Sequence, residues 1–304
     1  MTTGNNEDSD DDWSDTQSID SCEAYIHFES IRDPSTSLEE AVSFSWPGVY
    51  QEEQQQENQQ QQNEEEKVLR KITISTLLEE DDLAPLFGGC QWAGTRLWGA
   101  AVRAIQYLTG HLEGASGLEL VSSGSNNNSN NNINTTMLEL GCGLGVPGMI
   151  YHMLGSNVIL TDQEDILTQL EKNVLDNFPY TSTARVDGSQ HYIRAMPLSW
   201  SREGANSLLE QLHLSTDGFD IVLNCDCVFE PLYGKSWHLL NETIDELLKV
   251  NPKCIVVSSM ERRGQADGID LFIDEMKEME FVGSVEKVYY DEKRKIEIYV
   301  TRGL

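Results

Sequence analysis

Four glycines lie within eight residues, in the segment Glu139-Leu-Gly-Cys-Gly-Leu-Gly and the three residues after it. Glycine lets a backbone approach a ligand closely, and a helix that starts after such a loop offers free N–H donors. The pattern predicts a cofactor-binding loop, with a tight turn that binds nothing as the alternative. Gly143, Gly145 and Gly148 also satisfy the G-x-G-x-x-G fingerprint of dinucleotide binding, so the glycines do not choose the cofactor.

Asp162 ends the next apolar stretch, NVILTD, and lies 21 residues beyond Gly141. A carboxylate at the end of this strand is placed to accept hydrogen bonds from ribose hydroxyls. Asp162 therefore supports a cofactor that contains a nucleoside, but it does not indicate which of these cofactors binds. The alternative role for Asp162 is the N-cap of a helix that begins near Glu164.

A third segment with chemical potential is Asn224-Cys-Asp226-Cys-Val-Phe229, which directly follows a buried apolar stretch. Open α/β sheets bind ligands beyond the carboxyl ends of their strands, so we expect this segment in the same site as the glycines. The six histidines show no HxH or HExxH spacing, and no G-x-S-x-G is present. We therefore expect neither a metal centre nor a serine nucleophile.

Strands and helices must alternate to bring these segments together. Apolar patterns predict strands at 68–75, 137–140, 157–162, 219–226 and 254–259 and a pair within 285–302. Helical spacing follows at 96–108, after the glycines from Pro147, at 165–178, at 237–250 and at 269–279. The fold class is therefore α/β: a Rossmann-like, doubly wound, seven-stranded sheet, mostly parallel with an antiparallel C-terminal hairpin.

The first 66 residues differ in composition from the rest of the chain. They contain 18 of the 51 acidic residues and one of the 21 basic residues, and they end in the run QEEQQQENQQQQNEEE. Such a segment lacks the apolar surface that offsets ordering entropy. We predict an acidic, Gln-rich, largely disordered tail at 1–66, although the apolar Tyr25, Phe28, Phe44 and Trp46 leave a short ordered piece open.

One enzyme domain is expected at 67–304, with a Ser/Asn-rich surface loop inserted at 122–136. The formal charge of −30 argues against direct binding to nucleic acid or an anionic membrane and favours a basic partner. The cysteines lack zinc spacing, and the chain shows neither a signal peptide pattern nor a long apolar stretch. We expect a monomer with reduced thiols in the cytoplasm or the nucleus.

Six segments in this order resemble one known family: LELGCGLGVPG, VILTD, LTQLEKNVLDN, PLSW, NCDCVF and VYYDEKRKIEIYV. The chain is similar to the seven-β-strand, S-adenosylmethionine-dependent protein-lysine methyltransferases known as methyltransferase family 16. The resemblance covers roughly residues 68–304 and implies a class I methyltransferase domain with S-adenosyl-L-methionine as cofactor.

The resemblance also implies roles for individual residues. It places eight of them at the cofactor: Glu139, Gly141, Cys142 and Gly143 around the methionine part, Asp162 at the ribose, and Trp98, Trp200 and Cys225 nearby. Asp226 and Phe229 match a D-x-x-Y/F motif that borders the methyl-transfer site, and Phe229 supplies a wall but no hydroxyl. Core packing is the alternative for Phe229 and the two tryptophans.

Methyl transfer to lysine requires a neutral amine, and at pH 7 deprotonation of a free lysine costs about 4.6 kcal/mol. A nearby sulfonium and an apolar channel disfavour the ammonium, whereas a carboxylate favours it. We therefore expect Asp226 to capture and aim the amine, with general-base action as the alternative. The predicted function is methyl transfer to a lysine of a protein substrate. The alternatives are another side chain or a small molecule as acceptor, a non-catalytic binding module, and a dehydrogenase.

Overall fold

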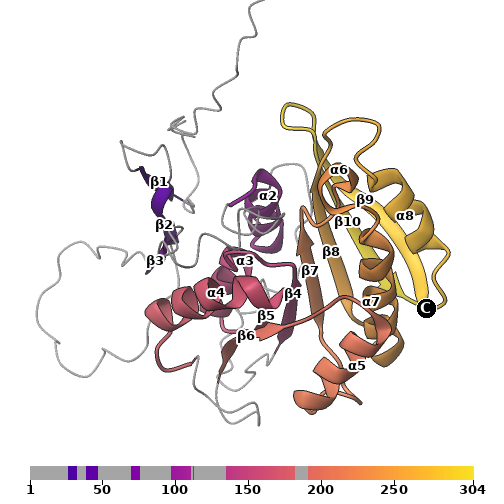
Figure 1. Cartoon of the computed structure of the whole chain (residues 1–304), viewed down its shortest axis with the longest axis horizontal. Helices are drawn as coiled ribbons and strands as arrows, with labels where there is room; N and C mark the ends of the chain where they lie inside the picture. The colour runs from indigo at the N-terminus through magenta and orange to yellow at the C-terminus, as the bar shows by residue number, and fades with distance from the viewer. Residues whose placement is uncertain are drawn as a thin grey trace, which may run out of the picture.

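The computed structural model describes residues 27–32, 39–46, 70–75, 97–110, 112, 135–181 and 191–304. Seven strands form its main sheet in the order β6-β5-β4-β7-β8-β10-β9 (Figure 1). They are β4 (Thr136–Leu140), β5 (Asn157–Asp162), β6 (Ile193–Pro197), β7 (Ile221–Cys225), β8 (Ile255–Glu261), β9 (Val282–Asp291) and β10 (Ile296–Gly303). The first five pair in parallel, and β10 pairs antiparallel with β8 and β9. The predicted fold class, including the C-terminal hairpin, is confirmed.

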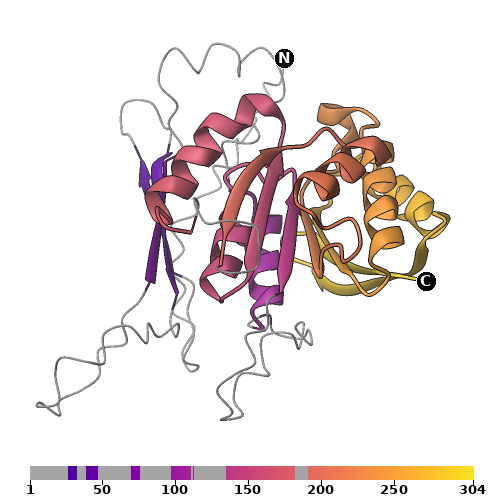
Figure 2. The same cartoon turned by 90° about the horizontal axis from the view of Figure 1, so that it is seen from below.

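Helices cover both faces of this sheet (Figures 1 and 2). One face carries α2 (Gly99–Leu108), α3 (Val146–Met153) and α4 (Glu164–Asn177), and the other carries α5 (Arg202–Gln211), α7 (Trp237–Val250) and α8 (Ile269–Lys277). A single short turn, α6 (Glu230–Tyr233), follows β7. The buried apolar side chains accordingly form two clusters, one on each face. This is the three-layer arrangement that buries both sides of a parallel sheet.

One strand of the main sheet is not the one that we expected. The strand predicted at 68–75 is present as β3 (Arg70–Ser75), but it pairs with β2 (Glu39–Trp46), which pairs with β1 (His27–Arg32) in a separate three-stranded sheet. Its buried Ile72 and Ile74 pack in the same apolar cluster as α3 and α4. The seventh strand of the main sheet is instead β6, whose five residues include an arginine and a proline and show no apolar period.

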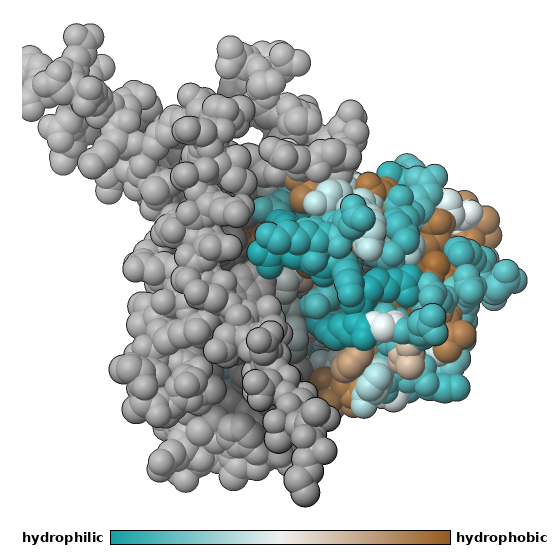
Figure 3. Space-filling view, turned by 90° about the horizontal axis from the view of Figure 1, so that it is seen from above, coloured by the Kyte–Doolittle hydropathy of each residue, from teal (hydrophilic) through white to brown (hydrophobic). Residues whose placement is uncertain are grey.

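β1 and β2 lie within the predicted tail and contain Phe28, Phe44 and Trp46, three of the four aromatic residues for which we left a short ordered piece open; the fourth, Tyr25, lies outside the described residues. The rest of the tail, and the insertion at 122–136 except for its last two residues, fall outside the described residues. The division into tail and domain therefore stays a prediction. Within the described ranges, no helix is long and apolar enough to cross a membrane. The described part of the face in Figure 3 is mostly hydrophilic, with hydrophobic side chains scattered over it.

Two neighbouring residues of α8 offer a test of this packing. Phe272 is fully buried under the sheet, whereas the adjacent Leu271 is 53% exposed. We expect Phe272→Ala to lower the free energy of unfolding by about 3 to 5 kcal/mol, because it leaves a cavity in the core. Leu271→Ala should change it by less than about 0.5 kcal/mol. Denaturant titration of both variants measures this, and equal losses would contradict the assigned packing of α8.

Candidate active site

The glycine loop connects the end of β4 to the start of α3 at the carboxyl edge of the sheet. Gly141, Gly143 and Gly145 all have positive φ, between 53° and 70°, which L-residues with side chains rarely adopt. A Cβ at Gly141 would lie 2.8 Å from Cys227 Sγ and 3.1 Å from a ring carbon of Trp200. The loop backbone is therefore held against these two side chains, and this conformation explains why the segment is rich in glycine.

Asp162 ends β5 and fastens the glycine loop. Its carboxylate accepts hydrogen bonds from the Gly143 N–H at 2.7 Å and from the Gln163 N–H at 2.8 Å. Burial raises its pKa, and these two hydrogen bonds oppose the increase. The N-cap of α4 is Gln163, and no side chain caps that helix. The alternative role of Asp162 as a helix cap is therefore not what the structure shows.

Glu139 is a buried carboxylic acid directly beneath the loop. It is 1% exposed and accepts a hydrogen bond from the Gly148 N–H in the first turn of α3 at 2.8 Å. Burial raises its pKa to about 8; the Gly148 hydrogen bond lowers it, and the charge of Asp162 adds a smaller increase. Without a bound cation, Glu139 is therefore largely protonated at neutral pH.

Asp226 follows β7 and is held in a backbone conformation that is unusual for a non-glycine residue, with φ of 58°. Its N–H donates to the Ser259 carbonyl at 2.8 Å, and its carboxylate forms an ion pair with Arg263, which follows β8. The Arg263 guanidinium lies 5.2 Å from the ring centroids of both Trp98 and Phe229. Two aromatic rings and a carboxylate thus surround one cation at the carboxyl edge of the sheet.

Arg263 is not among the site residues that the sequence pattern predicted. A clue was available, because Glu261-Arg-Arg263 directly follows the predicted strand CIVVSS and so leaves the sheet at the same edge as Asp226. The pairing itself depends on the neighbouring positions of β7 and β8, which the sequence pattern does not supply.

Three thiols lie around the loop: Cys142, Cys225 and Cys227. Cys227 Sγ is 3.2 Å from the Leu140 carbonyl oxygen, and Cys225 and Cys227 pack on opposite faces of the sheet. Burial, with nearby carboxylates adding to it, raises the pKa of all three thiols well above the ordinary value. They therefore stay protonated, and protonated thiols are poor nucleophiles even beside a reactive methyl donor.

The structure brings the ten predicted site residues to one edge of the sheet, in two groups. Glu139, Gly141, Cys142, Gly143, Asp162, Trp200 and Cys225 lie at or next to the glycine loop. Asp226, Phe229 and Trp98 surround Arg263, so Trp98 lies with the motif after β7. Their individual roles toward a cofactor or an acceptor stay predictions.

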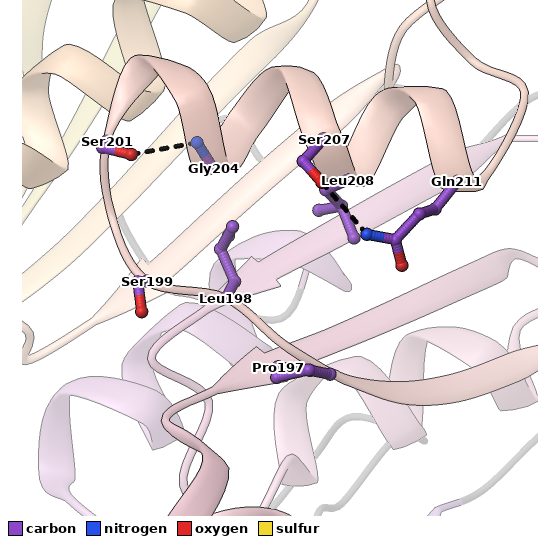
Figure 4. Close-up of a pocket in the computed structure, with 8 residues that line it drawn as sticks. All are labelled: Pro197, Leu198, Ser199, Ser201, Gly204, Ser207, Leu208 and Gln211. Atoms are coloured by element: carbon purple, nitrogen blue, oxygen red, sulfur yellow. Dashed lines mark hydrogen bonds between the residues drawn. The ribbon is translucent and has the colours of Figure 1, made fainter.

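A separate pocket of about 260 Å³ lies between α5 and the segment after β6. Figure 4 shows Ser207, Leu208 and Gln211 on one side of α5, facing this pocket. The segment begins beside the site, because the Leu198 N–H donates to the Asp162 carbonyl. No predicted site residue lines the pocket, and we assign it no role.

The residues at the glycine loop fit a nucleoside cofactor that carries an amino acid. The backbone cradle at Gly141 leaves no space for a side chain, and Asp162 and Glu139 are carboxylates suited to hydroxyl and ammonium groups. Asn224, fully buried one residue before Cys225, has a side-chain oxygen with no hydrogen-bond partner in the part of the chain that the structure describes. An acceptor atom of this kind at the strand end is expected where a ligand completes the site.

The strand order and the glycine loop define a Rossmann-like methyltransferase fold. A family described as "Lysine methyltransferase" matches residues 87–279. The chain belongs to this family, and its cofactor is S-adenosyl-L-methionine.

Three curated relatives extend this result. "Secreted RxLR effector protein 48" of Plasmopara viticola is 38% identical over 42% of this chain and 64% of its own length. "Protein N-lysine methyltransferase METTL21A" of Danio rerio is 29% identical over 54% of this chain and 64% of its own. "Histidine protein methyltransferase 1 homolog" of Dictyostelium discoideum is 28% identical over 66% of this chain and 53% of its own. The chain thus matches less than two thirds of the length of each relative.

The raised pKa of Glu139 predicts a pH dependence of stability. Its ordinary value is 4.5 and its value in the folded protein is about 8, so between these pH values the folded state binds more protons than the unfolded state. The free energy of unfolding should therefore fall as pH rises from 4.5 to 8 and level off above 8. Glu139→Gln should remove this fall in the free energy of unfolding, whereas Glu171→Gln, at an exposed position, should keep it. Denaturant titrations of the cofactor-free proteins at pH 5 to 9 measure it, and parallel curves for wild type and Glu139→Gln would refute it.

The position of Asp162 predicts a loss of cofactor affinity. Asp162→Ala removes the predicted ribose acceptor and the hydrogen bond that fastens Gly143, and should weaken binding by about 1 to 3 kcal/mol. Asp165→Ala, three residues later and exposed, is the matched control and should bind as wild type does. Calorimetric titration with S-adenosylmethionine measures both, and equal affinity of the Asp162 variant would contradict the prediction.

Proposed function

We propose that this protein is an S-adenosylmethionine-dependent methyltransferase that methylates a lysine side chain of a protein substrate. The single observation that carries the proposal is that Asp226, Phe229 and Trp98 lie together around Arg263 at the carboxyl edge of the sheet, the edge that also holds the glycine loop. Aromatic rings and a carboxylate recognise an alkylammonium and line a channel for its aliphatic stem. The similarity to a protein N-lysine methyltransferase supports the same acceptor.

When bound, S-adenosylmethionine supplies a methyl group on a sulfonium. The acceptor amine would have to lose its proton to solvent, because only the neutral amine has a lone pair that can accept the methyl group. Asp226 would orient the amine, and Phe229 and Trp98 would exclude water around it. Most of the acceleration would then come from proximity and alignment of the two reacting atoms.

The charge of the chain supports a substrate that is basic around its acceptor lysine. At −30, the formal net charge favours encounter with a positively charged surface. The cysteines at 142, 225, 227 and 254 are free thiols, in keeping with a cytoplasmic or nuclear location, which we propose on the same basis. Histidine as acceptor is the second candidate, because one relative is described as a histidine protein methyltransferase.

The test is transfer of a labelled methyl group from S-adenosylmethionine to lysate proteins, followed by mapping of the modified residues. We expect N-methyl-lysine in a basic protein. Label found in histidine alone or in small molecules would refute lysine as the acceptor, and no transfer despite cofactor binding would favour a non-catalytic module.

Once the protein substrate is identified, Asp226→Ala should lower the kcat of its methylation by about a hundredfold, because a misaligned acceptor amine costs a factor of this order. Cofactor affinity should change little, which also checks that the variant is folded. Asp217→Ala, an exposed aspartate in the loop before β7, is the control and should retain full turnover. An Asp226 variant with unchanged kcat would remove the aspartate from the acceptor site.

A further inference from the structure

Asp226 already has a permanent positive partner within the protein. Arg263 Nη1 lies 3.1 Å from Asp226 Oδ1, and Nη2 contacts Oδ2, which makes the pair bidentate. The side chains of Arg263 and Asp226 are 21% and 3% exposed. A buried bidentate pair is geometrically specific and costly to break, so Asp226 carries a balanced charge where the sequence alone suggests a free carboxylate.

The surroundings of Arg263 keep it positively charged and in place. Burial lowers the pKa of Arg263, but the hydrogen bonds and charge of Asp226, with the charge of Glu261, outweigh this and leave it raised. The flat guanidinium lies near both Trp98 and Phe229, as Arg does more readily than Lys. The pair is thus held by contacts from three segments of the chain: the one with Trp98, the one after β7 and the end of β8.

This arrangement resolves a conflict in the chemistry of lysine methylation. A free carboxylate would help to bind the substrate but would also stabilise its ammonium form, which has no lone pair to react. In the structure, Asp226 Oδ1 accepts from Arg263 and from the Glu261 N–H at 3.2 Å, while Oδ2, among the described residues, accepts from Arg263 alone. Oδ2 therefore keeps one lone pair that can orient an amine by hydrogen bonding.

We propose that Arg263 is a positioning residue that neutralises Asp226, so that the site orients an acceptor amine without stabilising its ammonium form. The inference rests on the proposed function and names the residue that sets the protonation preference of its acceptor site. Arg263 acts through Asp226 and takes no proton itself.

Other titratable groups face the pair from the elements around it. They are Cys225 at the end of β7, Cys227 after it, Tyr233 of α6, Glu261 of β8 and Asp267 of the loop before α8. The two thiols stay protonated, and Asp267 pairs with Arg262. Arg263 Nη2 also forms an ion pair with Glu261 at 3.0 Å, but the Glu261 side chain is 34% exposed, so water screens its charge more than that of Asp226.

A cofactor analogue tests the inference without any protein substrate. Sinefungin carries a primary amine where S-adenosylmethionine carries the reactive methyl, whereas S-adenosylhomocysteine has no group there. Arg263→Met removes the charge at similar length and should increase the affinity for sinefungin relative to S-adenosylhomocysteine by about tenfold at pH 7.5, because the ammonium then meets an unbalanced carboxylate. Arg263→Lys keeps the charge and should stay closer to the wild-type ratio. Calorimetric titration measures both affinities.

The double variant Arg263→Met/Asp226→Asn separates charge from packing. It contains neither charge and should return to the wild-type affinity ratio. An unchanged ratio in Arg263→Met, or the same increase in the double variant, would overturn the inference. Binding of S-adenosylhomocysteine by each variant shows that the cofactor site is folded, and no binding by wild type would overturn both the inference and the proposed function.

With a methylated lysine identified, the pH profile gives an independent readout. In Arg263→Met the rise of kcat with pH should move about one unit higher, with a lower KM, because the bound ammonium is stabilised. A higher kcat/KM at every pH, with no shift, would instead mean that Arg263 blocks the site, and would overturn the inference. If wild type binds the cofactor but methylates no lysine, the proposed function fails, and the affinity ratio still decides the effect of Arg263.

Discussion

Parallel pairing of β7 with β4 and β8 determines where the chemistry of this protein can take place. Leu140 pairs with Asn224, and Asn224 pairs with Ser258, so the carboxyl ends of the three strands lie side by side, with β8 continuing to Glu261. The glycine loop, Asp226 and the Glu261–Arg263 segment leave the sheet from these three ends. A register slip of one residue would turn every side chain of a strand to the other face and separate the groups. The two apolar layers hold the register, and the site depends on it.

The second constraint is the burial of carboxylates in a chain with 51 acidic and 21 basic residues. A buried charge must be paired or neutralised. Burial raises the pKa of Glu139 to about 8, which favours its neutral form, while Asp226 pairs with Arg263, and Glu297 pairs with Arg262 and Lys287. A few basic residues thus balance the acids that the fold buries.

Arg262 connects the buried Glu297 to the loop that carries Arg263. It bonds Glu297 on β10 and Asp270 on α8, and so anchors the loop after β8 at the residue next to Arg263. Neighbouring arginines therefore have different tasks, because consecutive side chains leave an extended segment in opposite directions. Arg262 fastens the loop to β10 and α8, and Arg263 faces the candidate site.

The sequence predicted the elements with a strong apolar period, and it failed where that period is weak. β4, β5, β7 and β8 carry continuous apolar stretches, and α7 carries a clear helical spacing. β6 is a five-residue edge strand with mostly half-buried side chains, so it shows little alternation. β3 does alternate, but no pattern within a strand says which sheet it joins. The glycines and Asp162 could be placed at the candidate site because they lie at strand ends, which the apolar pattern locates.

The sequence by itself determined the layered α/β fold, the glycine loop and the position of Asp226 after a strand, because periodicity and backbone conformation are local properties. The tertiary structure alone decided that Arg263 pairs with Asp226, that Trp98 and Phe229 both lie 5.2 Å from its guanidinium, and that burial raises the pKa of Glu139. These features depend on distances between residues far apart in the chain and on burial. Charge balance and pKa follow from three-dimensional surroundings, which no spacing along the chain contains.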